Sequence, residues 1–331
     1  MTDHTHTSLK RLKDTFKPTK GQIIPPVQRM LLKSAGDVGN RDTAHVHPSE
    51  MAKDDWCPRR AWLRITEAEP NKKKANASSK MEMIFQEGHD IHRKWQKWIH
   101  KSDGLVLLGK WKCRNCEDEW IGDALWQWCD CGMCDAEYKE VPFYSEDYRI
   151  MGHADGMVNL PDDKTVLIEI KSIGIGTLRF EMPDLYYDYI NGMSVADVWM
   201  RIKRPFPSHM RQGQIYLWLA REQYNENINE IVFIYDYKPT QEVREFAVQY
   251  NPKFVESLFN DAEMIKMAVE EGEEIPRPEW AAGIEGEICS ACEFSNACYG
   301  TPEEEQQPRM EPKRRVARSS SAKRRSAVRP S

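Results

Sequence analysis

A short apolar strand that carries two charged side chains is the feature that most constrains this fold. Residues 165–170, TVLIEI, are typical of a strand, and Lys171 follows them directly. Because side chains alternate between the two faces of a strand, Glu169 and Lys171 point the same way, while Ile168 and Ile170 face the core. The sequence therefore predicts a sheet in which one strand combines an apolar face with a polar site.

A second strand is expected immediately before this one, over residues 153–159. The segment between them, 160–164, reads LPDDK and has the residue types that a hairpin turn needs. In such a hairpin Asp155, at the start of the first strand, converges on the side of Glu169. Two carboxylates with a nearby histidine make an oxygen-rich site that suits Mg²⁺ or Mn²⁺, and Lys171 adds a positive charge beside it.

A helix expected over residues 81–100 supplies that histidine. Its apolar residues recur at steps of three and four, and His92 lies on the same stripe as Gly88 and Trp95. His92 therefore points inward, with His89 and His153 as the other candidates for the ligand. Further elements are expected as strands at 141–144, 231–237 and 243–250, and as helices at 208–224 and 253–271. This mixed order predicts an α/β fold with a central mixed sheet flanked by helices.

The two ends of the chain differ from its middle. Residues 1–46 are polar and interrupted by proline and glycine, which predicts a loosely ordered arm. The net charge of −5 hides nine basic residues and one acidic residue between 309 and 331, so we expect residues 301–331 to form a disordered basic tail. This tail is either a solubilising end or an arm that binds phosphates.

Composition excludes a membrane-spanning protein, because no apolar run approaches the roughly 20 residues that cross a bilayer. The N-terminus lacks the apolar core of a secretory signal, so a cytoplasmic location is expected. Nine cysteines in that reducing compartment indicate metal binding rather than disulfides.

Five of these cysteines fall in one short segment and predict an inserted zinc ribbon over residues 109–137. Tetrahedral zinc needs four thiolates, and two Cys-x-x-Cys pairs supply them. The expected ligands are Cys113, Cys116, Cys131 and Cys134. Cys129 is then surplus, and it could replace Cys131.

Four short motifs occur in a recognisable order: Gly88-x-x-x-His92, Gly152-x-x-Asp155-Gly156, Glu169-x-Lys171 and Gln212-x-x-x-Tyr216. Together they resemble the PD-(D/E)XK nuclease superfamily. The resemblance is narrower to its RecB-like exonucleases, which include the CRISPR-associated iron–sulfur exonucleases and phage-encoded relatives. It covers about residues 48–298 and implies a restriction-endonuclease-like nuclease domain over 47–300.

The resemblance also implies roles for these residues. A Mg²⁺ or Mn²⁺ ion would be bound by His92, Asp155, Glu169 and the backbone carbonyl of Ile170. Lys171 would orient or activate the attacking water. Gln212 and Tyr216, one helical turn apart, would position the substrate and the lysine.

The remaining cysteines complete the resemblance. Cys57 precedes Pro58-Arg-Arg60, and Cys289, Cys292 and Cys298 lie near the C-terminus, a pattern similar to the iron–sulfur branch of the RecB-like nucleases. Ligand count alone would allow zinc or a 4Fe–4S cluster. The resemblance implies the 4Fe–4S cluster, joining the N-terminal and C-terminal parts of the domain.

The leading hypothesis is a metal-dependent DNA exonuclease that acts on single strands or ends, in recombination, repair or phage replication. Aromatic and basic residues within 172–208 could track a single strand by stacking and phosphate contacts. The alternative is a non-catalytic nucleic-acid-binding subunit of a helicase–nuclease or integration complex, with a helicase or recombination protein as partner. The acidic pair and Lys171 argue for catalysis, because binding alone does not need them. Oligomeric state is not indicated by the sequence.

Overall fold

The computed structural model describes most of the expected domain. The described residues are 24–36, 42–68, 70, 78–124, 131, 135–281 and 283–300. The expected basic tail, 301–331, lies outside them, as do Cys129 and Cys134 of the expected ribbon.

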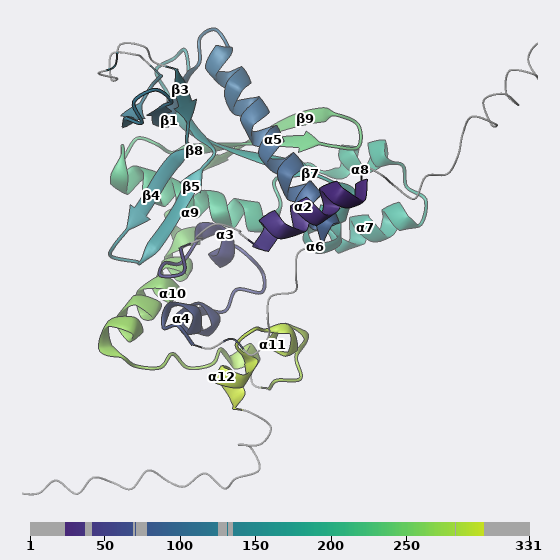
Figure 1. Ribbon diagram of the computed structural model, residues 1–331, viewed down its shortest axis with the longest axis vertical. Helices are drawn as coiled ribbons and strands as arrows, with labels where there is room; N and C mark the ends of the chain where they lie inside the picture. Colours follow the sequence, from purple (N-terminus) through teal and green to yellow (C-terminus); the bar gives the residue numbers. More distant parts are fainter. Residues whose placement is uncertain are drawn as a thin grey trace, which may run out of the picture.

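A mixed sheet forms the centre of the described chain (Figure 1). Its seven strands are β1 (Val106–Cys113), β2 (Glu119–Gly122), β3 (Ala136–Tyr138), β6 (Gly156–Asn159), β7 (Thr165–Ile173), β8 (Glu230–Tyr237) and β9 (Glu242–Gln249). The order is β2-β1-β6-β7-β8-β9, and β3 pairs with β1. The strands β7 and β8 are parallel, and the other pairs are antiparallel. The predicted α/β class with a central mixed sheet is confirmed. The strands β4 (Val141–Ser145) and β5 (Ile150–Ala154) form a separate antiparallel pair.

Helices lie on both faces of this sheet and also beyond it, at one end of the molecule (Figure 1). The longer ones are α5 (Ser79–Lys101), α9 (Pro207–Gln223) and α10 (Pro252–Glu271). The shorter ones are α2 (Ile24–Gly36), α3 (Pro48–Met51), α4 (Pro58–Ile65), α6 (Ile175–Glu181), α7 (Pro183–Ile190), α8 (Val195–Arg201), α11 (Glu287–Ala291) and α12 (Ser295–Tyr299), with a 3-10 turn at Glu279–Ala281. None of the described helices combines the length and the apolar character that a bilayer crossing requires.

Two hydrophobic clusters lie between the sheet and its helices, one on each face of the sheet. Ile91 of α5 packs with Ile168 and Ile170 on one side of β7. On the other side, Leu167 packs in the cluster that contains Ile215 of α9. Both faces of β7 are therefore buried, and Glu169 lies on the face toward α9, between Leu167 and Lys171.

The predicted hairpin forms with the expected turn. The pairing aligns Gly156 with Ile168 and Asn159 with Thr165, and the Leu160 N–H donates to the Lys164 carbonyl at 2.9 Å. The single strand expected over 153–159, however, is divided between β5 and β6. The division falls at Asp155, which lies between the two strands.

The arm expected over residues 1–46 contains a helix, α2, where loose order was predicted. Pro25 and Pro26 were interpreted as breaking regular structure, but they lie in the first turn of α2. Proline is tolerated there, because the first N–H groups of a helix have no intrahelical partner. At the end of the same segment, Val46 is fully buried and bridges to Ile150 at the start of β5.

Gly152 is expected to be intolerant of any side chain. A Cβ at this position would lie 2.8 Å from Cδ of Pro48 and 3.4 Å from Cε1 of Tyr216. The proline ring begins α3 and is buried, so it has little room to move. Gly152→Ala should therefore lower the free energy of unfolding by about 1–3 kcal/mol, as overpacking of a core does, with a lower thermal midpoint.

Gly176→Ala is the matched control for this experiment. A Cβ at Gly176 would meet no described atom within 4 Å, and this residue lies in helix α6. Its thermal midpoint should equal or exceed that of the wild type. Equal midpoints for Gly152→Ala and the wild type would contradict the close packing of Pro48 on β5.

Candidate functional site

Asp155 is held by contacts from three directions at the junction of β5 and β6. Its Oδ1 lies 2.9 Å from Nδ1 of His92, and its Oδ2 accepts a hydrogen bond of 2.6 Å from the Ile170 N–H. The backbone carbonyl of Asp155 accepts a hydrogen bond from Nε2 of Gln96, one helical turn after His92 on α5. The ladder of β6 and β7 stops here because the Asp155 carboxylate takes the N–H of Ile170. Of the three candidate histidines, His92 meets Asp155, whereas His89 and His153 are exposed.

Lys171 links strand β7 to helix α9. Its Nζ donates to Oε1 of Glu169 and to Oε1 of Gln212, both at 2.8 Å. Gln212 in turn donates from Nε2 to the Tyr216 hydroxyl at 3.1 Å. Two of the four sequence motifs are thus joined in one hydrogen-bond chain. The Asp155 motif reaches the same strand through the Ile170 N–H, and the His92 motif reaches it through Asp155.

Glu140 belongs to the site, although sequence reasoning did not select it. One ligand atom each from His92, Glu140 and Asp155 lie within 4.8 Å of one another. Glu169 is not in that group, and its Oε1 accepts a hydrogen bond from Lys171. Glu140 precedes β4 and has φ = +67°, a left-handed conformation that is uncommon for residues other than glycine. An isolated glutamate before a short strand carries no periodic signal, so nothing in the sequence marked it.

Burial and crowding of acidic groups alter the titration of this site. Burial, and then the neighbouring Asp155, raise the pKa of Glu140 to about 7. Burial also raises the pKa of Glu169, against the opposing effect of Lys171. For His92, burial lowers the pKa, but the hydrogen bond and charge of Asp155 outweigh burial and raise it overall. Acidic groups packed this closely favour a cation between them.

One buried oxygen of the site has no partner. Oε2 of Glu169 is buried and accepts no hydrogen bond from any described residue. A buried carboxylate oxygen in this state carries the full cost of its desolvation unless a cation or donor is supplied. The nearby group of His92, Glu140 and Asp155 offers carboxylate oxygens and one imidazole, a donor set that fits a divalent ion such as Mg²⁺ or Mn²⁺.

Four cysteines from opposite ends of the chain line a single cavity. Cys57 lies just before α4, and its three partners lie at α11 and α12, beside α4 at one end of the molecule (Figure 1). The cysteines that line the cavity are Cys57, Cys289, Cys292 and Cys298. The sequence grouping of these four residues is therefore matched by their position in space.

Residues on either side of Cys57 fix its position. Trp56 donates from Nε1 to Asp261 of α10 at 2.8 Å. Arg59, which is buried, donates to the carbonyl of Ile275 and to the carboxylate of Glu274 in the segment after α10. These contacts bind the start of α4 to the segment that leads to the C-terminal cysteines.

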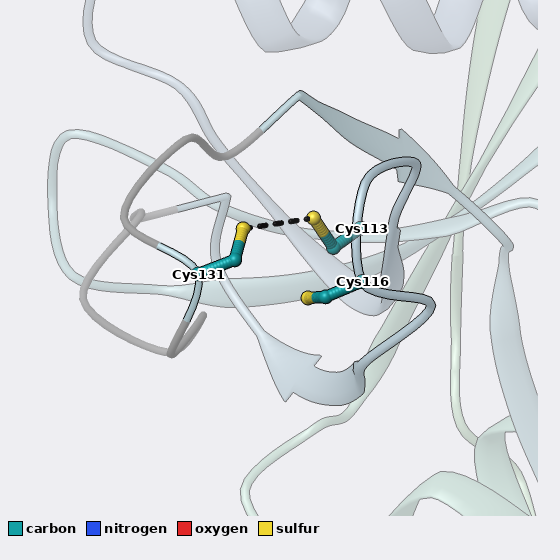
Figure 2. Close-up of side chains that lie close together, drawn as sticks. All are labelled: Cys113, Cys116 and Cys131. Carbon is teal, nitrogen blue, oxygen red and sulfur yellow. Dashed lines mark hydrogen bonds between the residues drawn. The ribbon is translucent and has the colours of Figure 1, made fainter.

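A second cysteine cluster lies at the end of β1 (Figure 2). Figure 2 shows Cys113, Cys116 and Cys131 gathered with their sulfur atoms facing a common space. The sulfurs of Cys113 and Cys131 are 3.7 Å apart, and all three lie within 4.8 Å of one another. Tetrahedral zinc with bonds of about 2.3 Å places its sulfurs about 3.8 Å apart, so this spacing fits one zinc ion.

The two cysteine clusters differ in sulfur spacing. Among the described residues, no three of the sulfurs of Cys57, Cys289, Cys292 and Cys298 all lie within 4.8 Å of one another, as those of Cys113, Cys116 and Cys131 do. Sulfurs that share one zinc ion must be close together, whereas in a 4Fe–4S cluster each thiolate binds a different iron atom and the sulfurs lie farther apart. The wider spacing fits the multi-iron group better than single zinc.

Comparison with known proteins gives no family for this chain. No protein-family model and no curated protein matches it. Similar solved structures include SSO0001, with 14% identity over 85% of this chain and 97% of that chain and a TM-score of 0.39. The alkaline exonuclease LHK-Exo from Laribacter hongkongensis has 11% identity over 74% of this chain and 93% of that chain, with a TM-score of 0.39. The complex of LHK-Exo with dAMP has 11% identity over 69% of this chain and 89% of that chain, with a TM-score of 0.36. TM-scores this low carry no argument about function, which must rest on the site itself.

Proposed function

We propose that this chain is a Mg²⁺- or Mn²⁺-dependent exonuclease that hydrolyses phosphodiester bonds at the ends of single-stranded DNA. The observation that carries the proposal is the convergence of four separated segments. His92 of α5, Asp155, the β7 pair of Glu169 and Lys171, and Gln212 of α9 form one continuous set of contacts.

The proposed ion ligands are His92, Asp155 and Glu169, with Glu140 as a further carboxylate. The backbone carbonyl of Ile170 is also proposed, because a strand residue directs its N–H and C=O toward the same side. The Ile170 N–H already meets Asp155, so its carbonyl faces the same region. When bound, a divalent ion supplies positive charge that polarises the phosphoryl group and eases the ionisation of water.

The side chains of the site orient the attacking water and balance the charge that develops during hydrolysis. Hydrolysis adds negative charge to the phosphoryl oxygens, and the Lys171 ammonium is placed to orient the attacking water and to balance that charge. Gln212 holds Lys171 from the side of α9, and Tyr216 holds Gln212. All three are packed against a buried sheet, so the lysine is oriented before substrate arrives.

The proposal also includes two metal sites formed by cysteines. We assign a structural 4Fe–4S cluster to Cys57, Cys289, Cys292 and Cys298, and a zinc ion to Cys113, Cys116, Cys131 and Cys134. The sulfur spacings described above support both assignments, and Cys134 is included from its sequence spacing alone. The role of the iron–sulfur cluster would be to join the two ends of the domain.

A cleavage assay on matched DNA substrates tests the proposed function. Purified protein with Mn²⁺ should degrade linear single strands labelled at either end and should leave a circular single strand of the same sequence intact. Cleavage of the circle would indicate an endonuclease, and cleavage of RNA alone would change the substrate class. Fully metallated protein that binds DNA without cutting any of these substrates would favour a non-catalytic binding subunit.

Glu140→Gln tests whether Glu140 takes part in metal binding. Removing one charged oxygen ligand should weaken Mn²⁺ binding at least about 10-fold, measured by titration calorimetry. Glu146→Gln, an exposed glutamate in the β4–β5 hairpin, is the matched control and should bind Mn²⁺ as the wild type does. Wild-type affinity in Glu140→Gln would exclude Glu140 from the ligand set.

The same substitution should alter the pH dependence of stability in the metal-free protein. The pKa of Glu140 is about 7 in the folded state, above its usual value of 4.5. Such a group stabilises the fold at low pH, and this contribution is lost as the pH rises through about 7. In EDTA the wild type should therefore unfold at lower denaturant concentration near pH 8 than near pH 5. Glu140→Gln should reduce that difference, and an unchanged pH profile would contradict the burial of this carboxyl.

A further inference from the structure

Helix α5 presents a row of residues to the candidate site, spaced by one helical turn. The row is Gly88, His92 and Gln96, and residues four apart lie on the same side of a helix. His92 contacts the Asp155 carboxylate at 2.9 Å, and Gln96 donates to the Asp155 carbonyl at 2.9 Å. Two members of the row thus hold Asp155, and Gly88 is the next position along it.

Packing does not explain the glycine at position 88. A Cβ there would meet no atom of the described residues within 4 Å. By contrast, a Cβ at Gly213 of α9 would lie 2.5 Å from the Phe233 ring, so that glycine is needed for helix–sheet contact. Glycine in the interior of a helix costs stability relative to alanine. Gly88 therefore keeps a space open at the expense of the helix that carries His92.

The turn of α5 that carries Gly88 lies beside the end of β7. Glu87, the neighbour of Gly88, pairs with Lys238 at 3.1 Å, and the Lys238 N–H donates to the carbonyl of Ile173, the last residue of β7. Ile173 is two residues beyond Lys171. A group entering the space would therefore pass close to the metal ligands and to the end of the strand that carries the lysine.

We propose that Gly88 provides clearance for the sugar–phosphate backbone of the nucleic-acid strand next to the scissile bond. The inference rests on the proposed function and deepens it, because it assigns a position where the strand lies directly against α5. The backbone of a nucleic acid is wider than a water molecule or an ion, so a side chain at this point would hold it away from His92. A small diester, which extends little beyond the reacting phosphate, would be affected less.

The test compares Gly88→Ala and Gly88→Leu with Gln86→Leu in the full-length protein. Gln86 is exposed on α5 and lies roughly 200° around the helix from Gly88, so Gln86→Leu places the same leucine side chain on the opposite side. Each variant is assayed on a single-stranded oligonucleotide and on bis(p-nitrophenyl) phosphate with Mn²⁺. The Mn²⁺ affinity, the oligonucleotide affinity and the melting temperature of each variant are also measured.

In Gly88→Leu the ratio of oligonucleotide cleavage to diester cleavage should fall at least about 10-fold, with a smaller fall in Gly88→Ala. Neither variant should melt below the wild type or bind Mn²⁺ more weakly, and Gln86→Leu should keep the wild-type ratio. A wild-type ratio in Gly88→Leu, or a drop in its melting temperature, would overturn the clearance role.

The same measurements distinguish failure of the nuclease proposal from failure of the inference about Gly88. A wild-type protein that binds Mn²⁺ but hydrolyses neither substrate would refute the nuclease assignment, and oligonucleotide affinity then decides the inference. Weaker binding by Gly88→Leu than by Gln86→Leu would support a strand against α5, whereas equal binding, or none by the wild type, would overturn it.

Discussion

Lys171→Ala is expected to reduce DNA cleavage at least about 100-fold while leaving DNA affinity almost unchanged. The ammonium group is held at 2.8 Å from both Glu169 and Gln212, so it is fixed in place rather than extended into solvent. Loss of one preoriented group that stabilises developing negative charge typically lowers kcat by about 10²–10³. Most of the affinity for DNA comes from many phosphate contacts, of which this lysine would supply at most one. Cleavage rates under saturating Mn²⁺ and affinities for a labelled single strand would separate the two effects.

Lys164→Ala is the matched control for this prediction. Lys164 lies in the turn of the same hairpin and forms an ion pair with Glu230 at 2.9 Å, away from the site. It should cleave DNA at the wild-type rate. Because removing Lys171 leaves Glu169 buried without its cation, melting temperatures must also be compared. A folded Lys171→Ala protein that still cuts at the wild-type rate would remove the lysine from the mechanism.

Serine substitutions in the two cysteine clusters are expected to have reciprocal effects on metal content. Anaerobically purified wild type should be brown, with iron and zinc in a ratio of about 4:1. Cys57→Ser should lose the iron and the colour but keep the zinc, whereas Cys116→Ser should lose zinc and keep iron. Metal analysis and visible absorption of the two variants provide the measurement.

The loss of stability should be larger for Cys57→Ser than for Cys116→Ser. The first cluster would join Cys57 to Cys289, Cys292 and Cys298 and so close a far longer loop than the second, which would join positions 113 and 131. The entropy that a cross-link removes from the unfolded chain grows with loop length. Colourless wild-type protein with zinc at both sites would contradict the iron–sulfur assignment but would leave the nuclease proposal standing.

The sequence predicted the site best where periodicity and hairpin chemistry act over short distances. Glu169 and Lys171 share a face of β7, and the turn before this strand forms as expected. His92 points inward to Asp155, although Ile84 and Trp98 of the apolar stripe expected on this helix are exposed. Helix α9 places Gln212 one turn from Tyr216. Such features depend on side-chain spacing along one element, which the sequence specifies directly.

Other features escaped sequence reasoning because they depend on which segments meet. The strand expected over 153–159 divides at Asp155, since the Asp155 carboxylate takes an N–H from β7 in place of a ladder bond. The helix α2 was missed because prolines in a first turn resemble prolines in a loop. The local sequence pattern could not show that the strand divides at Asp155 or that α2 forms.

By itself, the sequence determined the chemical types available: carboxylates, an imidazole, an ammonium group and two sets of thiols. The tertiary structure alone decided that Glu140 joins His92 and Asp155, and that the sulfurs around Cys57 are more widely spaced than those around Cys113. The physical reason is that hydrophobic spacing records whether a residue is buried. The partner against which it is buried is fixed only when distant segments pack together.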